Sequence, residues 1–385
     1  MKDKLNITII NRMMLTHFGG GENFDLNVAR EMRRRGHNVK ILTGKTFVRR
    51  AKPPEDVYSF EIETAPFIHV AHLSNKLGNT NKLRWFASSL CINLDYLSFE
   101  LSVFKKLKKD NWTDVYHICG LPRLASWIYK KLKKPVVVWW PGVPSRLARR
   151  YLDKYPVNVA GGDVYPKIKN WCNNARYVEI GVDTEFFKPL ESKSAFSEIK
   201  FLFVGRLIKI KNLPFLLKGF KKVLEKHCNV SLYIVGDGEE KPKLEKLVKE
   251  WRIDNKVKFY GHLYKEKLLK MYQSADVFVI TSEYENFPNV VLEAMACGLP
   301  VIATSVGGMI KQVKEGQTGF LVPLNDETVL SERMGFFIKN LDKIIEFGKR
   351  ARDFVVKNFS WEVTGDRLEE IYTELVNLSG GCSDK

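Results

Sequence analysis

Short apolar runs rich in β-branched residues alternate with amphipathic stretches along the whole chain. The first half contains five runs that predict strands: "LNITIIN", "NVKILTG", "DVYHICG", "PVVVWW" and "ARYVEIG". The second half contains six: "IKFLFVG", "VSLYIVG", "KVKFYGH", "DVFVITS", "PVIATS" and "GFLVPL". Helical patterns such as "NLPFLLKGFKKVLEKH" and "KEKLLKMYQSA" separate them. Strands that alternate with helices in this way are typical of parallel α/β sheets.

The chain divides into two predicted domains, because its 385 residues exceed one ordinary hydrophobic core. The polar segment "KPLESKSAFSE" lacks periodicity and marks the division. We predict a Rossmann-like domain at 1–188, a linker at 189–198, a second Rossmann-like domain at 199–360, and a helix and tail at 361–385 that could pack back on the first domain. The economical α/β fold is two doubly wound domains facing each other across a cleft, with ligands at the carboxyl ends of the strands.

The composition excludes several classes of protein. An apolar fraction of 45% is ordinary for a globular chain. The six cysteines are scattered without a CxxC pair, which fits neither a disulfide framework nor a zinc site and is compatible with a reducing cytoplasm. The first residues lack a signal-peptide layout, and no apolar run approaches the roughly 18 residues that cross a bilayer. We therefore expect a cytoplasmic protein that is soluble or peripheral on a membrane.

The net charge of +18 is concentrated in the first half of the chain. Residues 1–190 hold 32 Lys and Arg against 17 Asp and Glu, a net charge of +15, whereas the remaining residues hold 30 against 27, a net charge of +3. Basic clusters occur at 33–35, 105–109, 130–134 and 146–150. Such clusters are either solvated helix faces or a surface for anionic lipid head groups or another anionic partner, and the sequence leaves both open.

Two loops at predicted strand ends have a composition suited to phosphate. "HFGGGEN" follows the first strand, and its glycines, including Gly20 and Gly21, allow the backbone to approach a ligand just before a helix start. In "VGRLIKIKN", Arg206 and Lys211 flank the end of another strand, and a guanidinium with an ammonium suits a diphosphate. Each loop could instead be an ordinary flexible turn or a solvated loop.

The stretch "EYENFPNVVLEAMACGLPVIATS" places two carboxylates eight residues apart around a buried helix. We predict Asn286 as the N-cap of this helix, with Pro288 in its first turn. Glu285 then lies at the mouth of the site, where it could accept hydrogen bonds from sugar hydroxyls. Glu293 lies about two turns inside, where it could accept them from a ribose. In a purely structural role, Glu293 would need a buried Arg or Lys partner.

These segments together resemble a known family. "ENFPNVVLEAMACGLPVIATSVGG" is similar to the Glu-x7-Glu signature of retaining glycosyltransferases of the family 4 type, which belong to the glycosyl transferases of group 1 and have the GT-B fold. "GGGEN", "IGVDTEFFKP", "VGRLIKIKN", "IVGDGEEKPKLE", "FYGHL" and "ADVFVITSEYENFP" are similar to other blocks of the family and occur in the expected order. The resemblance covers nearly the whole chain and is strongest from about residue 177 to 323.

The resemblance implies roles for individual residues. Arg206 and Lys211 would bind the donor diphosphate and Glu285 would contact the transferred sugar, so these three are the catalytic candidates. Glu293 would hold the ribose, and the residues at the end of the third strand of the second domain would edge the base. The implied donor-binding set is Gly20, Gly21, Gly205, His262, Leu263, Asn286, Phe287, Pro288, Asn289, Val290 and Glu293.

The sequence departs from the family pattern at two places. Members often have His-x-His at a strand end of the first domain, and here "YHICG" keeps His117 but has Cys119 at the second position. Both are candidates for the acceptor side, and a catalytic role there stays open. In "VGGMIKQV", Ile310 and Lys311 replace a frequent Pro-Glu. We expect this to alter the loop and to leave donor binding intact.

The resemblance implies an activity. The chain would be a hexosyltransferase-type enzyme that moves a sugar from a nucleoside-diphosphate sugar, with UDP or GDP, to a lipid-linked or glycan acceptor, as in polysaccharide or glycolipid biosynthesis. Retention is generally thought to involve the leaving phosphate as the group that helps to deprotonate the acceptor. No Asp-x-Asp occurs in the chain, so we expect neither a metal nor another cofactor. Two cations and a helix start would stabilise the charge on the diphosphate.

Other functions compete with this interpretation. A catalytically impaired relative would keep the same fold. A sugar epimerase or a phosphorylase shares the fold but lacks this order of blocks. A basic nucleic-acid-binding protein would explain the charge, yet no recognition module is present, and we expect no nucleic-acid partner.

The first domain is where the family places the acceptor, and here it is basic. We therefore predict contact with an anionic membrane surface, with the protein peripheral on the cytoplasmic face. The amphipathic segment "YLSFELSVFKKLKK" is a candidate contact, or else an ordinary packed surface helix.

Overall fold

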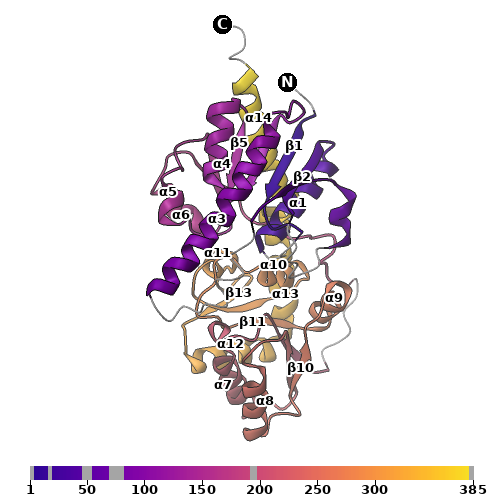
Figure 1. The fold of residues 1–385 in the computed structure, drawn as a ribbon. Helices are drawn as coiled ribbons and strands as arrows, with labels where there is room; N and C mark the ends of the chain where they lie inside the picture. Colours follow the sequence, from indigo (N-terminus) through magenta and orange to yellow (C-terminus); the bar gives the residue numbers. More distant parts are fainter. Residues whose placement is uncertain (1–3, 16–19, 46–53, 69–81, 191–196, 381–385) are drawn as a thin grey trace. The chain divides into compact units, whose positions relative to one another are not determined.

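The computed structural model describes residues 4–15, 20–45, 54–68, 82–190 and 197–380. It forms two compact units: the first is Met1–Glu179 with Thr364–Lys385, and the second is Ile180–Val363 (Figure 1). The division falls earlier than the predicted boundary at residue 188, and part of the predicted linker lies outside the described residues. From Thr364 onward the last helix groups with the first unit, which confirms the predicted packing of the C-terminal helix.

The described part of the first unit contains a parallel sheet of seven strands in the order β3-β2-β1-β4-β5-β6-β7. The strands are β1 (Asn6–Asn11), β2 (Asn38–Lys45), β3 (Glu61–Pro66), β4 (Val115–Cys119), β5 (Val136–Trp139), β6 (Val157–Ala160) and β7 (Ala175–Tyr177). All five predicted runs are confirmed. The sequence missed β3, an edge strand that contains two glutamates, and β6, whose four residues lie between a proline and two glycines. Neither has a long apolar run.

Helices flank this sheet (Figure 1). They are α1 (Gly20–Arg34), the 3-10 helix η1 (Glu55–Ser59), α3 (Lys82–Leu107), α4 (Pro122–Trp127), the π-helical turn η2 (Ile128–Leu132), α5 (Arg146–Arg149), α6 (Val164–Lys169) and α14 (Trp361–Gly380). Successive strand side chains point to opposite faces of a sheet. Tyr116 and Ile118 of β4 therefore join a core with Phe99 of α3 and Leu124 of α4. His117, between them, points to the other face.

Three of the four basic clusters lie at the ends of helical segments. Residues 33–35 close α1 before β2, residues 105–109 close α3 before β4, and residues 130–134 close η2 before β5. Cations stabilise the C-terminal ends of helices. Each of these ends leads into the amino end of a strand, opposite the edge where parallel sheets bind ligands. The arrangement favours helix-end roles over a ligand surface for these three clusters, and in the first of them Arg35 pairs with Glu31, Asp366 and Glu369.

The second unit contains a parallel sheet of six strands in the order β10-β9-β8-β11-β12-β13. The strands are β8 (Ile199–Val204), β9 (Val230–Val235), β10 (Val257–Gly261), β11 (Val277–Ile280), β12 (Val301–Thr304) and β13 (Gly319–Val322). The helices are η3 (Lys209–Lys211), α7 (Leu213–Leu224), α8 (Lys241–Glu250), α9 (Lys265–Ser274), α10 (Asn289–Ala296), α11 (Met309–Gln312), α12 (Glu327–Lys339) and α13 (Leu341–Phe359). All six predicted strands are confirmed.

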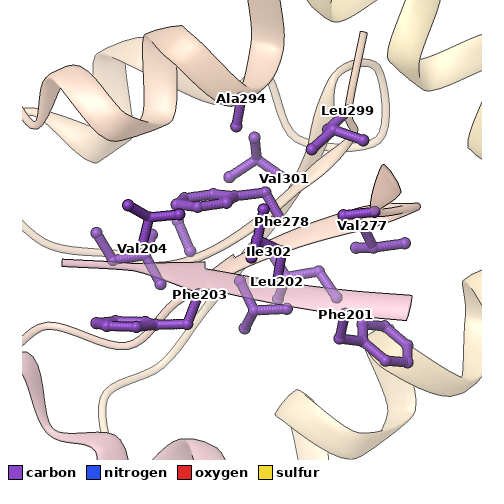
Figure 2. Packing of buried hydrophobic residues seen from close by; sticks show 14 of the residues in the cluster. Phe201, Leu202, Phe203, Val204, Val277, Phe278, Ala294, Leu299, Val301 and Ile302 are labelled. Carbon is purple, nitrogen blue, oxygen red and sulfur yellow. The ribbon is translucent and has the colours of Figure 1, made fainter. Parts of the chain in front are cut away.

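The core of the second unit explains why its strands were easy to predict. Phe201, Leu202 and Phe203 are consecutive in β8, and all three are fully buried. Figure 2 shows their side chains packed with those of β11 and β12, with Ala294 of α10 above the sheet. A parallel strand that is covered on both faces has a continuous apolar run, and such runs stand out in a sequence. The two units are therefore parallel-sheet α/β folds of the Rossmann type.

Candidate active site

In each unit the order of the strands reverses beside the first strand. β1 pairs with both β2 and β4, and β8 pairs with both β9 and β11. Ligands of doubly wound sheets bind outside the carboxyl ends of the strands at this reversal. The residues predicted from the sequence follow these same strands. In the second unit, Arg206 and Lys211 come after β8 and Glu285 comes after β11.

Lys211, Ser282 and Glu285 form a group that we call the loop cluster. The Lys211 ammonium pairs with Oε1 of Glu285, and the Ser282 hydroxyl donates a hydrogen bond of 2.8 Å to the same oxygen. The Lys211 and Glu285 side chains are 15% and 14% exposed. Glu285 is therefore fixed by two donors but still reaches solvent.

The two loops that carry the loop cluster are joined by their backbones. The amide of Glu283 donates to the carbonyl of Ile210 over 2.8 Å. The buried hydroxyl of Thr281 is 3.2 Å from the carbonyl oxygens of both Lys211 and Asn212. Because β8 and β11 are neighbours, these bonds tie the carboxyl ends of two strands into one rigid surface.

Arg206 differs from Lys211. Its side chain is exposed and makes no ion pair with a described residue. Its backbone is held by a second glycine turn after β9: a Cβ on Gly236 would lie 1.8 Å from the carbonyl oxygen of Gly205, and one on Gly238 would lie 2.4 Å from that of Leu207. Both glycines also have positive φ, which other residues rarely adopt. Both positions therefore require glycine, for lack of space and for backbone conformation. Arg206 is thus a free cation on a fixed backbone.

Helix α10 begins later than predicted. Its first residue is Asn289, and Pro288 occupies the N-cap position with extended dihedral angles, so the prediction of Asn286 as the N-cap is wrong. A residue that precedes proline is disfavoured in the helical conformation, which keeps Phe287 out of the helix. Helix α10 still begins four residues after Glu285, and Oδ1 of Asn289 in its first turn is buried without a hydrogen bond from the described residues.

The glycine pair before α11 packs against this helix start. The amide of Gly308 donates to the carbonyl of Glu285 over 3.1 Å, and a Cβ on Gly308 would lie 2.0 Å from the carbonyl oxygen of Asn286. Ile310 and Lys311, which replace the frequent Pro-Glu of the family, are both exposed. The contact that shapes the loop is therefore made by glycine and is separate from the replaced pair.

Glu293 lies in α10 and accepts a hydrogen bond of 2.8 Å at Oε2 from the hydroxyl of Tyr272 in α9. Among the described residues no Arg or Lys pairs with it. Burial raises the pKa of Glu293 to about 7, and the Tyr272 hydrogen bond lowers it. Its partner is thus a neutral hydroxyl instead of the cation that a structural role would require.

The end of β10 carries the two residues predicted to edge a base. His262 is exposed, Leu263 is half-buried, and the ring of His262 lies 4.1 Å from that of Tyr264. They follow β10, which lies two places from β8 and three places from β11 in the sheet.

In the first unit, the glycine loop is described only in part. Gly20 and Gly21 open α1 after β1, and residues 16–19 lie outside the described residues. A Cβ on Gly21 would lie 3.5 Å from Pro141 and 3.6 Å from the sulfur of Cys119. The loops after β1, β4 and β5 therefore meet at the carboxyl ends of these strands.

Asp25, His117 and Tyr372 form a second group, which we call the buried cluster. Nδ1 of His117 lies 2.6 Å from the Tyr372 hydroxyl, and Nε2 lies 3.3 Å from Oδ1 of Asp25. His117 and Asp25 have no exposed surface. Asn11 donates a hydrogen bond of 2.6 Å to the other oxygen of Asp25. His117 is therefore enclosed between α1 and α14, which the sequence did not indicate.

Cys119 is closer to the surface than His117. It ends β4 and is half-buried, and burial together with the neighbouring Asp25 raises the pKa of its thiol well above the usual value. The thiol is neutral at physiological pH. Sequence reasoning missed Asp25, Tyr272 and Tyr372, because each becomes a partner only through tertiary packing.

Among the described residues, no group of three or more His, Cys, Asp and Glu side chains lies close enough to hold a metal ion. No described helix is long and apolar enough to cross a membrane.

Comparison with known proteins shows a family match over part of the chain and a fold match over nearly all of it. Residues 186–354 match the family Glycosyl transferases group 1. The chain is 34% identical over 187 residues to an uncharacterized glycosyltransferase of Methanocaldococcus jannaschii, covering 46% of each chain. It is 34% identical over 183 residues to a D-inositol 3-phosphate glycosyltransferase of Corynebacterium urealyticum, covering 46% of this chain and 43% of the other. The chain thus spans under half the length of these relatives.

Similarity to solved structures extends over the whole fold. A glycosyltransferase from Rickettsia africae superposes with a TM-score of 0.76 at 18% identity, covering 97% of this chain and 99% of the other. The Anabaena protein HepE, solved in complex with UDP and glucose, superposes with a TM-score of 0.69 at 16% identity, covering 96% of this chain and all of the other. Residues 186–354 are thus similar in sequence to the Glycosyl transferases group 1, and the chain has the two-unit GT-B fold of the solved glycosyltransferases.

Proposed function

We propose that the chain transfers a sugar from a nucleoside-diphosphate sugar to a lipid-linked or glycan acceptor, with retention of the anomeric configuration. The observation that carries this proposal is the loop cluster at the strand reversal of the second unit. Arg206, which follows β8, adds an exposed cation that makes no ion pair with a described residue. Cations and free helix amides beside a fixed carboxylate suit a sugar diphosphate.

Each residue then has a distinct part in the reaction. Arg206 and Lys211 stabilise negative charge as the bond between the sugar and the diphosphate breaks. Glu285 orients the hydroxyls of the transferred sugar, and the amides at the start of α10 contact sugar and phosphate. The acceptor hydroxyl attacks from the side of the leaving phosphate, which takes its proton. Neither a metal nor a cofactor takes part, since these donors supply the charge stabilisation.

The donor side is tested by the thermal stability of the purified protein with UDP, GDP, ADP and their sugar conjugates. A ligand at one hundred times its dissociation constant adds about 2.7 kcal/mol to stability. One nucleotide series should raise the melting temperature of the wild type, and Arg206→Ala and Glu293→Ala should abolish the shift. Lys246→Ala, which removes an exposed cation on α8, is the control and should keep it. A wild type that responds to no nucleotide would contradict the proposal.

We also propose an anionic membrane surface on the cytoplasmic face as a partner of the basic first unit. The segment "YLSFELSVFKKLKK" offers little apolar surface for a contact there, because Phe99, Val103 and Leu107 are buried in the core and Leu101 is its one large exposed apolar side chain among the described residues. The segment after β5 is better suited. Val143 and Leu147 are 45% and 52% exposed beside the exposed Arg146. Apolar side chains among arginines are typical of interfacial contacts.

Co-sedimentation with vesicles tests this partner. The wild type should bind vesicles that contain anionic phospholipid and should release them at high salt, whereas zwitterionic vesicles should leave it in solution. Leu147→Asp should reduce binding, and Leu101→Asp, at an exposed position of α3, should leave it unchanged. Salt-independent behaviour or absence of binding would remove the membrane from the proposal.

A further inference from the structure

Tyr272 lies beneath the donor site and is fixed by its surroundings. It comes from α9 and has no exposed surface. Its ring packs edge-on against Phe187 at 5.8 Å and tilted against Phe278 at 6.1 Å. Its hydroxyl donates to Oε2 of Glu293 over 2.8 Å. Because the ring cannot move without disturbing the core, the hydroxyl holds one oxygen of Glu293 at a fixed position.

The second oxygen of Glu293 is available. Oε1 accepts no hydrogen bond from the described residues and is absent from the buried unpaired atoms, and Glu293 as a whole is only partly buried. A carboxylate has room for several hydrogen bonds, and here one side is satisfied by the protein. The other side remains free to accept from a ligand.

No cation in the described structure is placed to neutralise Glu293. Cys297 follows α10, and burial with the nearby Glu293 raises the pKa of its thiol, so it is neutral. Arg352 of α13 is the nearby cation, but its guanidinium donates to the carbonyl oxygens of Ala296, Phe187 and Thr184. Because burial alone raises the pKa of Glu293, the Tyr272 hydroxyl is what favours its ionised form.

We propose that Tyr272 is a positioning residue of the donor site. Its hydroxyl holds the carboxylate of Glu293 in one orientation and favours the ionised form, so that Oε1 accepts hydrogen bonds from the ribose of the nucleotide. This inference rests on the proposed function, because it requires a nucleotide sugar at this site. It adds a residue that touches no substrate and acts only through Glu293.

The consequence is a pH dependence of donor binding. Ionised Glu293 accepts from hydroxyls better than the neutral acid does. Affinity should therefore rise with pH to a plateau, with a midpoint near the pKa of Glu293, about 7. Loss of the hydroxyl raises that pKa, and each unit of increase lowers the affinity about tenfold below the midpoint.

The experiment is calorimetric titration from pH 5.5 to 8.5 with the nucleotide sugar that stabilises the wild type. Its diphosphate diester keeps the same charge over this range, unlike a free nucleoside diphosphate. Tyr272→Phe should move the midpoint to higher pH, bind about tenfold more weakly at pH 7, and approach the wild type at pH 8.5. Glu293→Gln should bind weakly with no pH dependence. Tyr155→Phe removes another buried, hydrogen-bonded hydroxyl in the first unit and should behave as the wild type.

The outcomes separate the inference from the function on which it rests. A wild type that binds no nucleotide sugar overturns the proposed function and the inference with it. A wild type that binds, with Tyr272→Phe weakened by the same factor at every pH, assigns Tyr272 a packing role and overturns the inference alone. If Tyr272→Phe leaves both the affinity and the midpoint pH unchanged, the inference is likewise overturned and the proposed function stands.

Discussion

The buried cluster of the first unit and the loop cluster of the second lie at corresponding places in their sheets. His117 belongs to β4, the neighbour of β1, and Glu285 follows β11, the neighbour of β8. Asp25 and His117 are fully buried, whereas Lys211 and Glu285 are partly exposed. Charge that is fully desolvated must be satisfied by the protein itself, but charge at a surface can exchange water for a ligand. The two clusters therefore differ in access: the buried cluster is closed to solvent, whereas the loop cluster remains open to it.

The buried cluster should have the largest effect on stability. Asp25→Ala leaves the buried amide of Asn11 without its acceptor and removes the carboxylate that lies 3.3 Å from Nε2 of His117, and we expect a loss of about 3 kcal/mol in the free energy of unfolding. Urea unfolding followed by circular dichroism measures it. The control is Asp56→Ala, which breaks an ion pair with Arg30 in which both side chains are over a third exposed and should cost less than about 1 kcal/mol. Equal losses of unfolding free energy in the two variants would show that the buried Asp25 contributes no more to stability than an exposed carboxylate does.

Glu293 extends the comparison, because it is a carboxylate of the second unit whose pKa is raised by burial. The folded pKa of about 7 exceeds the unfolded value of about 4.3, so the group's contribution to stability is present below pH 4.3 and is lost as the pH rises to 7. Glu293→Gln should thus be more stable than the wild type at pH 8, by on the order of 3 kcal/mol. The difference should shrink toward pH 4.5 in parallel denaturant titrations. A constant difference at all pH values would show that Glu293 ionises normally.

Lys211→Ala should reduce nucleotide-sugar affinity more than stability. Loss of a charge-assisted hydrogen bond of about 1.5–3 kcal/mol weakens binding about ten- to a hundredfold. Stability should change by less than about 1 kcal/mol, because Ser282 and water still solvate Glu285. Calorimetric titration and urea unfolding of the same samples provide both values. Lys209→Ala, an exposed neighbour in η3, is the control. A stability loss larger than the binding loss would make the loop cluster structural.

Tyr372→Phe should have the smallest of these effects. It removes the hydroxyl that lies 2.6 Å from Nδ1 of His117 and keeps the ring, so we expect a loss of about 1 kcal/mol in unfolding free energy. Nucleotide-sugar affinity should be unchanged. A weaker nucleotide-sugar affinity with an unchanged free energy of unfolding would show that the buried cluster contributes to ligand binding.

The second unit shows how far sequence patterns can reach. All six of its strands, and the placement of Arg206, Lys211 and Glu285 at strand ends, could be predicted because fully buried parallel strands are long apolar runs. β3 and β6 could not, because an edge strand with glutamates and a strand of four residues lack such runs. The residue type of Asn286 favours a helix cap, but the conformational restriction on the residue before Pro288 makes the helix begin later, at Asn289.

The amino-acid sequence by itself determined the α/β class, the order of the strands' apolar runs and the loops that carry glycine, arginine and glutamate. These are local properties, set by side-chain periodicity and backbone preferences. Only the tertiary structure decided which charges are paired. Tyr272 reaches Glu293 across 21 residues and Tyr372 reaches His117 across 255. Whether a carboxylate is neutralised, held or left for a ligand depends on side chains brought together by packing, and no local pattern encodes that.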